Sequence, residues 1–337
     1  MSQWAFIGAS TIAREWMLDA VRAQGGEVTS VLSRDAARGE AFAHNNSIPR
    51  AYTDVDKLLA TEKPDAVYIS TTNELHKEQC LAAAAAGAHV VCEKPLALTL
   101  TDAEEMVAAC NQAGVLMATN HHLRAAAAHE KIRELLRAGA IGELIAVRVH
   151  HAVYLPPHLQ GWRLDKPQAG GGVVLDITVH DADLLAYLVD DYPQQVTAMT
   201  HNCGMGKGVE DGAMSVWRYK NNVLCQTHES FTMRYAMTGL ELHGTAGSVY
   251  AKDVLTQKAV GEVFLRNEDG FQKIEYAPRN LYEYAMARFC AAMAGQGRPL
   301  VDGVDGVRSL AVALAVLESA KCGAAVAVNY GHYAPAE

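Results

Sequence analysis

The chain has 337 residues, half of them hydrophobic and a fifth charged, with a formal net charge of −9 and a pI near 5.9. This length is typical of about two domains, and the composition supplies ample apolar surface for their cores. The acidic balance, without a basic stripe, argues against nucleic-acid binding and leaves a small molecule as the expected partner.

Through residue 121, short apolar runs alternate with helical patterns. Such alternation with short connections is typical of a parallel sheet covered on both faces, so residues 1–121 predict a first, doubly wound domain. The expected strands are residues 3–7, 28–32, 66–70, 89–92 and 115–119. The expected helices are residues 12–24, 34–44, 54–60, 75–86 and 102–113, the last with Thr101 or Asp102 as its N-cap.

Residues 122–337 read as a second, substrate-binding α+β domain. Strand-like runs at hairpin spacing predict a large, open, mostly antiparallel sheet. The open face is expected to stay solvated or to pair with a second copy, so the chain is a monomer or a homo-oligomer. Strands are expected at residues 144–153, 196–200, 214–219, 223–229 and 240–243, and helices at 130–138, 173–188, 281–294 and 306–320.

The seven cysteines and the N-terminus bear on the cellular compartment. The cysteines are odd in number and far apart, so no pair has the spacing of a metal or redox motif, and we expect them to be reduced and mostly buried. Because no signal-like segment or membrane-length apolar run is present, we expect a soluble cytoplasmic protein that does not bind a membrane.

The run Gly8-Ala9-Ser10-Thr11-Ile12-Ala13 follows the first expected strand and opens the first helix. A helix N-terminus offers free N–H groups and a positive dipole end to a pyrophosphate. Ser10 and Ala13 stand where the second and third glycines of the usual pattern lie. An ordinary strand–helix turn is the alternative, but the position in the first βα unit favours dinucleotide binding.

The second strand ends in Ser33-Arg34, where NAD-preferring folds place an acidic residue. Ser33, Arg34 and Arg38 can bind a ribose 2′-phosphate, which favours NADP(H). The alternative is that Asp35 binds the ribose, although Asp35 is better explained as an N-cap.

Glu93-Lys94-Pro95 follows the strand at residues 89–92, at the sheet edge where doubly wound folds bind ligands. A Lys-Pro step there can adopt a cis bond that fixes the direction of the ammonium group. The alternative is a simple ion pair between Glu93 and Lys94.

Asp176 and His180 are four residues apart and are therefore expected on one helix face, after a glycine run (residues 170–172) that permits close approach of a ligand. His180 can exchange a proton near neutral pH. The alternative is that the two side chains only pair with each other. We expect no metal site, and the remaining histidine motifs are interpreted as pocket-lining or structural: His121, His122, His150, His151 and His158. The loop at residues 154–163 is either the wall of a sugar pocket or a surface loop.

The chain resembles the glucose-fructose oxidoreductase / inositol dehydrogenase family over its whole length. The resemblance rests on the motifs described above and on Ser70-Thr71-Thr72-Asn73-Glu74-Leu75-His76. Residues 8–16, 120–124 and 151–164 resemble one group of sugar-ketone reductases within it. The resemblance implies a Rossmann domain, NADP(H) and a sugar substrate. It places further residues at the cofactor: Thr71, Thr72, Asn73, His76, Glu93, Lys94, Asn120, Trp162, Arg163 and Tyr282.

The expected reaction is hydride transfer from NADPH to the C2 ketone of a sugar. His180 would donate the proton, Lys94 would stabilise the oxyanion, and Asp176 would hold hydroxyls or the imidazole. Lys94 is the alternative proton donor. Two other functions remain open: an NAD(P)-dependent dehydrogenase for inositol or an aldose, and an NADP-sensing regulator without turnover.

Overall fold

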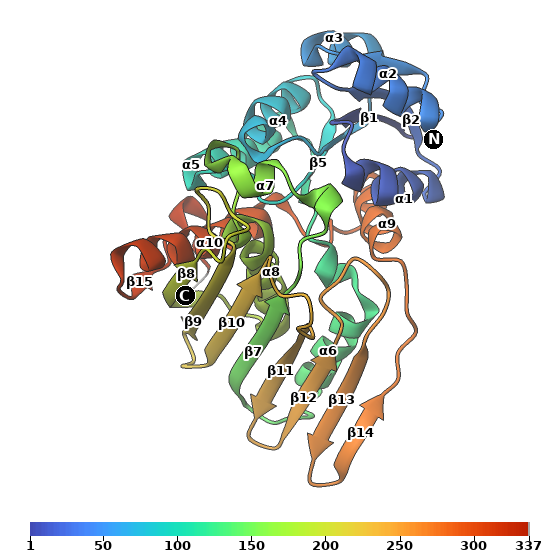
Figure 1. Cartoon of the computed structure of the whole chain (residues 1–337). Helices are drawn as coiled ribbons and strands as arrows, with labels where there is room; N and C mark the ends of the chain where they lie inside the picture. Colours follow the sequence, from blue (N-terminus) through green and yellow to red (C-terminus); the bar gives the residue numbers. More distant parts are fainter. Residues whose placement is uncertain (336–337) are drawn as a thin grey trace. The chain divides into compact units, whose positions relative to one another are not determined.

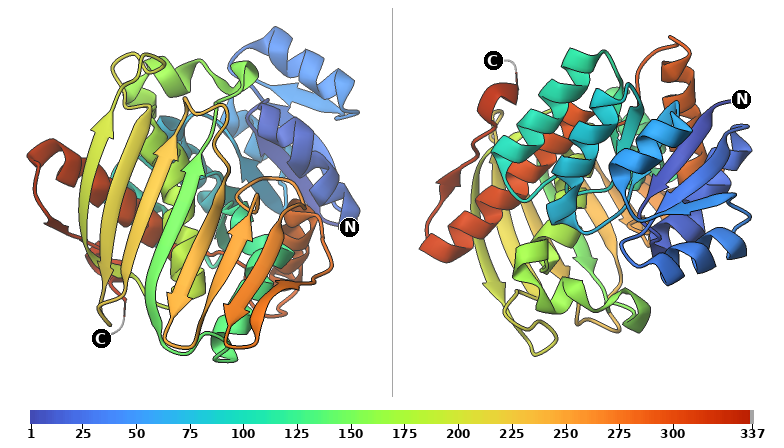
Figure 2. Two further views of the ribbon diagram at one scale, coloured as in Figure 1. Left: turned by 60° about the horizontal axis from the view of Figure 1, so that its bottom comes forward. Right: turned by 90° about the horizontal axis from the view of Figure 1, so that it is seen from above.

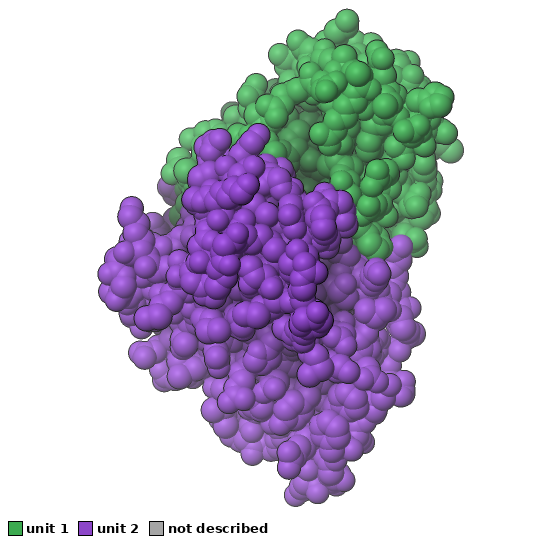
Figure 3. Space-filling view, viewed as in Figure 1, with its two compact units in different colours: residues 1–121, 282–307 green, residues 122–281, 308–337 purple. Residues whose placement is uncertain are grey.

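The computed structural model describes residues 1–335 and divides into two compact units (Figures 1 and 3). Unit 1 comprises Met1–His121 and Tyr282–Val307, and unit 2 comprises His122–Leu281 and the chain from Arg308 onward. The segment Tyr282–Val307, expected in the second domain, therefore groups with unit 1. Aromatic packing gives the reason, because Phe289 contacts Trp4 at a centroid distance of 5.8 Å and Tyr282 stacks on Trp16 at 5.2 Å.

Unit 1 is built on a six-stranded parallel sheet in the order β3-β2-β1-β4-β5-β6. This is the doubly wound topology predicted from the strand–helix alternation. β3 was not predicted, because it has only three residues and two of them are partly exposed. The strands are β1 (Gln3–Ile7), β2 (Glu27–Leu32), β3 (Arg50–Tyr52), β4 (Ala66–Ile69), β5 (His89–Cys92) and β6 (Met117–Thr119).

The helices of unit 1 begin near the predicted residues. For two of them the N-cap can be compared with the prediction. Asp35 caps its helix, since its carboxylate accepts the Arg38 N–H at 3.0 Å, as predicted. The predicted cap at Thr101 or Asp102 is wrong: Thr99 is the N-cap and accepts the Asp102 N–H at 3.2 Å. The helices are a π-helical turn (Ala13–Met17) continuing into α1 (Leu18–Ala23), α2 (Ala36–Asn45), α3 (Val55–Glu62), α4 (His76–Ala85), α5 (Leu100–Ala113) and most of α9 (Leu281–Met293).

Unit 2 contains a nine-stranded mixed sheet in the order β14-β13-β12-β11-β7-β10-β9-β8-β15. All neighbouring strands are antiparallel except β7 and β10, which confirms the predicted open, mostly antiparallel sheet. The strands after residue 246 were not predicted. The nine are β7 (Leu144–Ala152), β8 (Pro193–His201), β9 (Gly212–Tyr219), β10 (Leu224–Ser230), β11 (Gly239–Gly244), β12 (Gly247–Lys252), β13 (Glu262–Asn267), β14 (Gly270–Ile274) and β15 (Val326–Ala327).

One face of this sheet is covered by helices and the other is open (Figure 2, left). Buried and exposed residues alternate along β9, as expected for a sheet with one solvated face. Large apolar side chains lie on the open face, including Met199, which is 81% exposed, and Met214. The helices of this unit are α6 (Ala127–Arg137), the short α7 (Trp162–Asp165), α8 (Val179–Val189) and most of α10 (Gly303–Cys322).

Two further observations concern the cysteines and membrane-spanning helices. All seven cysteines are free, and four are buried, namely Cys80, Cys92, Cys110 and Cys225. Within residues 1–335 no helix is long and apolar enough to cross a membrane.

Candidate functional site

Gly8 lies where the end of β1 approaches the end of β4. Its φ of +121° is in the region that favours glycine, and a Cβ atom there would lie 2.8 Å from the carbonyl carbon of Ser70. Ser70 Oγ also donates to the Gly8 carbonyl at 3.3 Å. Only glycine allows the loop to turn this close to the neighbouring strand.

Ser10 closes the loop with its side chain. Its Oγ accepts the Ala13 N–H at 3.1 Å and donates to Ser70 Oγ at 2.8 Å. The hydroxyl therefore caps the first helical turn at the place of the usual glycine. Helix geometry leaves the N–H groups of Thr11 and Ile12 without a carbonyl partner one turn earlier, and such groups, with Ala9 beside them, suit an anionic pyrophosphate.

The residues after β2 differ in their exposure and in the contacts that they make. Ser33 is buried at the strand end, and Arg34 is exposed. Asp35 is engaged as the N-cap of α2. Arg38 reaches back to the Gly8 loop, where its Nη2 donates to the Ala9 carbonyl at 2.6 Å.

Lys94 follows β5, and its bond to Pro95 is cis, which the sequence had left as a possibility. The turn is held by His76, which is fully buried and has one ring nitrogen 3.0 Å from the Pro95 carbonyl and the other 3.3 Å from that of Thr71. Burial lowers the pKa of His76, so the ring is neutral at pH 7 and can donate to only one of these carbonyls. His76 therefore ties the Thr71 segment to the lysine turn, and its ring is enclosed by the chain itself.

The remaining predicted residues of this segment make short side-chain contacts. Thr71 Oγ1 donates to Gln79 at 2.7 Å and Thr72 Oγ1 to Glu74 at 2.8 Å, while Asn73 is buried. These contacts order the loop after β4, which lies at the same sheet edge as Gly8.

The Glu93 carboxylate accepts two hydrogen bonds at one oxygen, from Tyr68 Oη and Asn120 Nδ2, each at 2.6 Å. Burial raises the pKa of Glu93 above its usual value, and these two hydrogen bonds act in the opposite direction. Glu93 thus links the ends of β4, β5 and β6 beneath Lys94.

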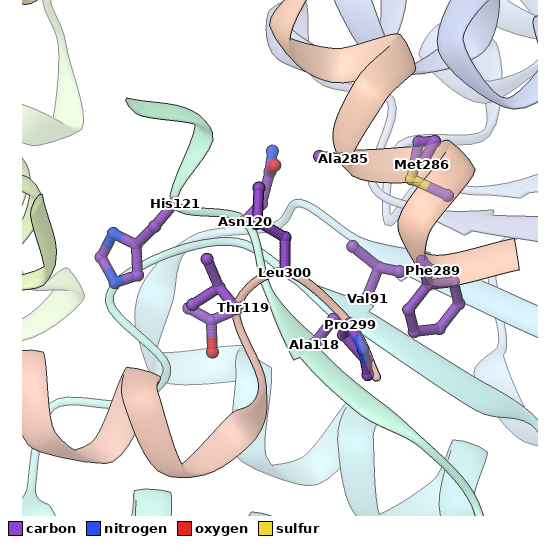
Figure 4. Close-up of a pocket in the computed structure, with 11 residues that line it drawn as sticks. Val91, Ala118, Thr119, Asn120, His121, Ala285, Met286, Phe289, Pro299 and Leu300 are labelled. Carbon is purple, nitrogen blue, oxygen red and sulfur yellow. The ribbon is translucent and has the colours of Figure 1, made fainter. Parts of the chain in front are cut away.

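Asn120 and its neighbour His121 also line a small cavity of unit 1 (Figure 4). The rest of its wall is mainly apolar and includes Met286 and Phe289 of α9. Tyr282, at the start of α9, is fully buried against Trp16. The same cavity is thus lined by the segment 282–307 and by the ends of β5 and β6.

Asp176 and His180 belong to unit 2, on a helix that begins with a π-helical turn (Val174–Thr178) and continues as α8. The i,i+4 argument for a regular helix therefore does not apply strictly, since Asp176 lies in the wider turn. The Asp176 carboxylate pairs with Arg163 Nε at 3.3 Å, and Arg163 packs over the Trp162 ring at 4.7 Å. His180 is 8% exposed, and its ring meets that of His122 edge-on at 4.8 Å.

The sequence missed Glu210, which holds the start of this helix. Its carbonyl accepts the Val173 N–H and its Oε1 accepts the Val174 N–H, both at 3.1 Å. Gly172, with φ +114°, has the Glu210 carboxylate where a side chain would lie, and a Cβ at Gly171 would meet the Trp162 carbonyl at 2.8 Å. The glycine run thus makes room for the chain itself, whereas we expected it to make room for a ligand.

We expect Glu210→Ala to lower kcat and to destabilise the fold by about 1 kcal/mol, the typical cost of a lost N-terminal cap. The mutation releases the helix turn that carries Asp176. Glu210→Gln keeps an acceptor oxygen and is expected to restore both properties. Steady-state kinetics and urea unfolding measure the two effects, and a Gln variant as impaired as the Ala variant would contradict the capping role.

A buried acidic network lies next to His180 and was also missed. Asp181 is fully buried, and its Oδ1 is 2.7 Å from His151 Nδ1. Burial, and then the charge of Asp181, raise the pKa of nearby Glu229 well above its usual value. His151, interpreted from the sequence as pocket-lining or structural, is here a partner of Asp181. These carboxyl groups lie on strands and helices remote in sequence, so no local motif marks them.

The loop at residues 154–163 lies along a groove of unit 2. The groove is lined by Tyr154, Gln160 and Leu164 and, in the loop between β8 and β9, by Cys203, Gly204, Met205 and Lys207. The Arg234 guanidinium packs over the Tyr154 ring at 3.6 Å. This polar and aromatic lining has the composition of a small-molecule site.

Comparison with known proteins assigns both parts of the chain. Residues 2–121 match the model of the oxidoreductase family with an NAD-binding Rossmann fold, and residues 129–250 match the GFO/IDH/MocA C-terminal domain. The 1,5-anhydro-D-fructose reductase of Ensifer adhaerens is 55% identical over 98% of this chain and 100% of its own length.

More distant proteins share the architecture. D-xylose 1-dehydrogenase (NADP(+)) 2 of Haloferax volcanii is 28% identical over 97% of this chain and 99% of its own length. The aldose-aldose oxidoreductase of Caulobacter crescentus, 24% identical, superposes with a TM-score of 0.87 over 97% of this chain and 99% of that one, which supports the fold alone. The resemblance seen in the sequence is confirmed: the chain belongs to the GFO/IDH/MocA family and is an oxidoreductase with a Rossmann domain for a nicotinamide dinucleotide.

Proposed function

We propose that the protein reduces 1,5-anhydro-D-fructose to 1,5-anhydro-D-mannitol with NADPH. The observation that carries the proposal is the 55% identity, over essentially both full lengths, to a 1,5-anhydro-D-fructose reductase. The sugar dehydrogenases among its relatives are only 28% identical. The segments 8–16, 120–124 and 151–164, which resemble bacterial 1,5-anhydro-D-fructose reductases, support the same substrate.

The cofactor-binding residues we propose follow from the loop chemistry. The N–H groups of Ala9, Ser10, Thr11 and Ile12 would bind the pyrophosphate at the turn that Gly8 allows. Ser33, Arg34 and Arg38 would bind the 2′-phosphate, and Asp35 is already engaged as a cap. The other proposed contacts are Thr71, Thr72, Asn73, His76, Glu93, Lys94, Asn120, Trp162, Arg163 and Tyr282, with His76 acting through the turn it holds.

When bound, NADPH would supply a hydride to the carbonyl carbon at C2 of the sugar. His180 donates a proton to the oxygen as negative charge develops there. The Lys94 ammonium orients the carbonyl and stabilises that charge. Asp176, held by Arg163, binds sugar hydroxyls or the imidazole.

The test is NADPH consumption by the purified chain with 1,5-anhydro-D-fructose and a panel of other keto-sugars, followed by identification of the product. NADP+ and NAD+ reduction with inositol and aldoses is measured in parallel. We expect kcat/KM to be highest for 1,5-anhydro-D-fructose with NADPH. A higher value for oxidation of inositol or an aldose would replace the proposal by a dehydrogenase, and no turnover with any pair would favour a cofactor sensor.

Cofactor choice is tested by Ser33→Asp. A carboxylate at this buried strand end would repel the 2′-phosphate and bind a ribose hydroxyl instead, so we expect the NADPH-to-NADH ratio of kcat/KM to fall by about ten- to a hundredfold. Thr101→Asp adds the same charge at an exposed residue of unit 1 and serves as the control. An unchanged ratio in Ser33→Asp would refute the assignment of this position.

A further inference from the structure

Three side chains of metal-binding type gather where β8 and β9 are joined. His201 ends β8, Asp211 immediately precedes β9, and Cys203 lies in the loop between them. One nitrogen, one sulfur and one oxygen of these residues all lie within 4.8 Å of one another. All three belong to unit 2, and none takes part in the chemistry proposed above.

Asp211 is held in place by the loop. It is fully buried, its Oδ1 accepts the Cys203 N–H at 2.7 Å, and its Oδ2 accepts the N–H groups of Met205 and Gly206 at 2.8 and 3.0 Å. The two oxygens of a carboxylate have about four lone-pair sites, of which these three hydrogen bonds use three.

The imidazole of His201 rests on a surface that only glycine provides. A Cβ atom at Gly212 would clash with the ring nitrogen Nε2 and would lie 2.6 Å from the ring carbon Cε1, so any other residue there would displace the ring. The Asp211 N–H donates to the His201 carbonyl at 3.1 Å and fixes the backbone between them. The Asp211 carboxylate and the His201 backbone are therefore positioned before any ligand arrives.

Cys203 differs from most other cysteines of the chain because it is exposed, whereas Cys80, Cys92, Cys110 and Cys225 are buried in the two cores. Its thiol stands at the loop surface, accessible to an ion from solvent.

We propose that His201, Cys203 and Asp211 bind a zinc ion, with water as the fourth ligand. Imidazole nitrogen, thiolate sulfur and carboxylate oxygen are the ligands that Zn²⁺ uses in proteins, at about 2.0–2.3 Å each. Ligand atoms within 4.8 Å of one another need only a small closure of the exposed loop to reach tetrahedral spacing. The sequence prediction of no metal site considered cysteine pairs and neighbouring histidines, whereas this set takes one residue of each kind.

The bound ion would link His201 and Cys203, at the start of the loop between β8 and β9, to Asp211 at its end. This loop also lines the groove with Tyr154 and Gln160, and the Lys207 N–H donates to the Leu164 carbonyl at 2.6 Å. Because zinc would bind the folded chain, it is expected to raise the Tm of the full chain.

Equilibrium titration of the metal-free full chain with Zn²⁺, followed by calorimetry, is the direct test. We expect one equivalent to bind with a micromolar or lower Kd, and Cys203→Ser and His201→Ala each to weaken binding by about tenfold or more. Cys322→Ser removes the other exposed cysteine and is expected to leave the affinity unchanged. Titration with Co²⁺ should give a thiolate-to-cobalt charge-transfer band that Cys203→Ser abolishes and Cys322→Ser retains.

His201 and Cys203 are both exposed, so Cys203→Ser and His201→Ala are expected to fold. Circular dichroism verifies this. Failure of the wild-type chain to bind zinc at tens of micromolar, about ten times the expected upper limit of Kd, would overturn the proposal. Binding that persists equally in Cys203→Ser and His201→Ala would place the ion elsewhere and overturn it as well.

Discussion

Replacing His180 with alanine is expected to lower kcat by about 10²- to 10⁴-fold while leaving the affinity for NADPH nearly unchanged. The imidazole is the proposed proton donor, and its removal leaves the developing alkoxide to be protonated by a weaker acid or by water. His180 is only 8% exposed and packs against the His122 ring, so its surroundings fix the ring direction. Single-turnover kinetics and NADPH binding by fluorescence separate the two effects.

The matched control is His44→Ala, which removes an exposed histidine of unit 1 and is expected to keep the wild-type kcat. Near-normal turnover in His180→Ala would refute the proton-donor role. Lys94→Ala would then be the decisive variant, because its ammonium group is the other proposed donor.

Gly8→Ala is expected to weaken NADPH binding by more than about tenfold and to destabilise the fold by at least 2 kcal/mol. The left-handed φ alone costs an alanine about 1–2 kcal/mol. The added Cβ would also lie 2.8 Å from the Ser70 carbonyl carbon and 2.9 Å from its oxygen, so β1 and β4 must separate just where the pyrophosphate would bind. NADPH titration and urea unfolding of the same variant measure both losses.

Gly87→Ala measures the cost of the positive φ alone, without a steric contact. Gly87 has φ +78°, but no atom lies within 4 Å of the position of its missing Cβ. We expect this control to lose about 1 kcal/mol of stability and to bind NADPH normally. Equal losses of NADPH affinity in the two variants would show that the close approach to Ser70 is not what the dinucleotide requires.

Much of unit 1 is predictable because its signals are local. The apolar runs and helical periods between residues 3 and 119 give five of the six parallel strands, and the cap chemistry of Asp35 follows from its place before α2. The prediction failed at Thr99, which is the N-cap and lies two residues before Thr101 and three before Asp102, the two candidates. Among the strands missed after residue 246, β14 is mostly exposed and carries no clear alternation of buried and exposed residues, whereas β12 and β13 do alternate.

The sequence by itself determined the strand–helix order of the Rossmann unit and the loop at Gly8, and it allowed the cis bond at Pro95. These depend on periods and neighbours within a few residues, which the chain displays directly. Only the tertiary structure decided that Glu210 caps a helix 36 residues earlier in the chain, that Asp181 pairs with His151, and that Tyr282–Val307 groups with unit 1. Those pairings arise when distant segments pack and bury polar groups that must find partners, and nothing in the local pattern names the partner.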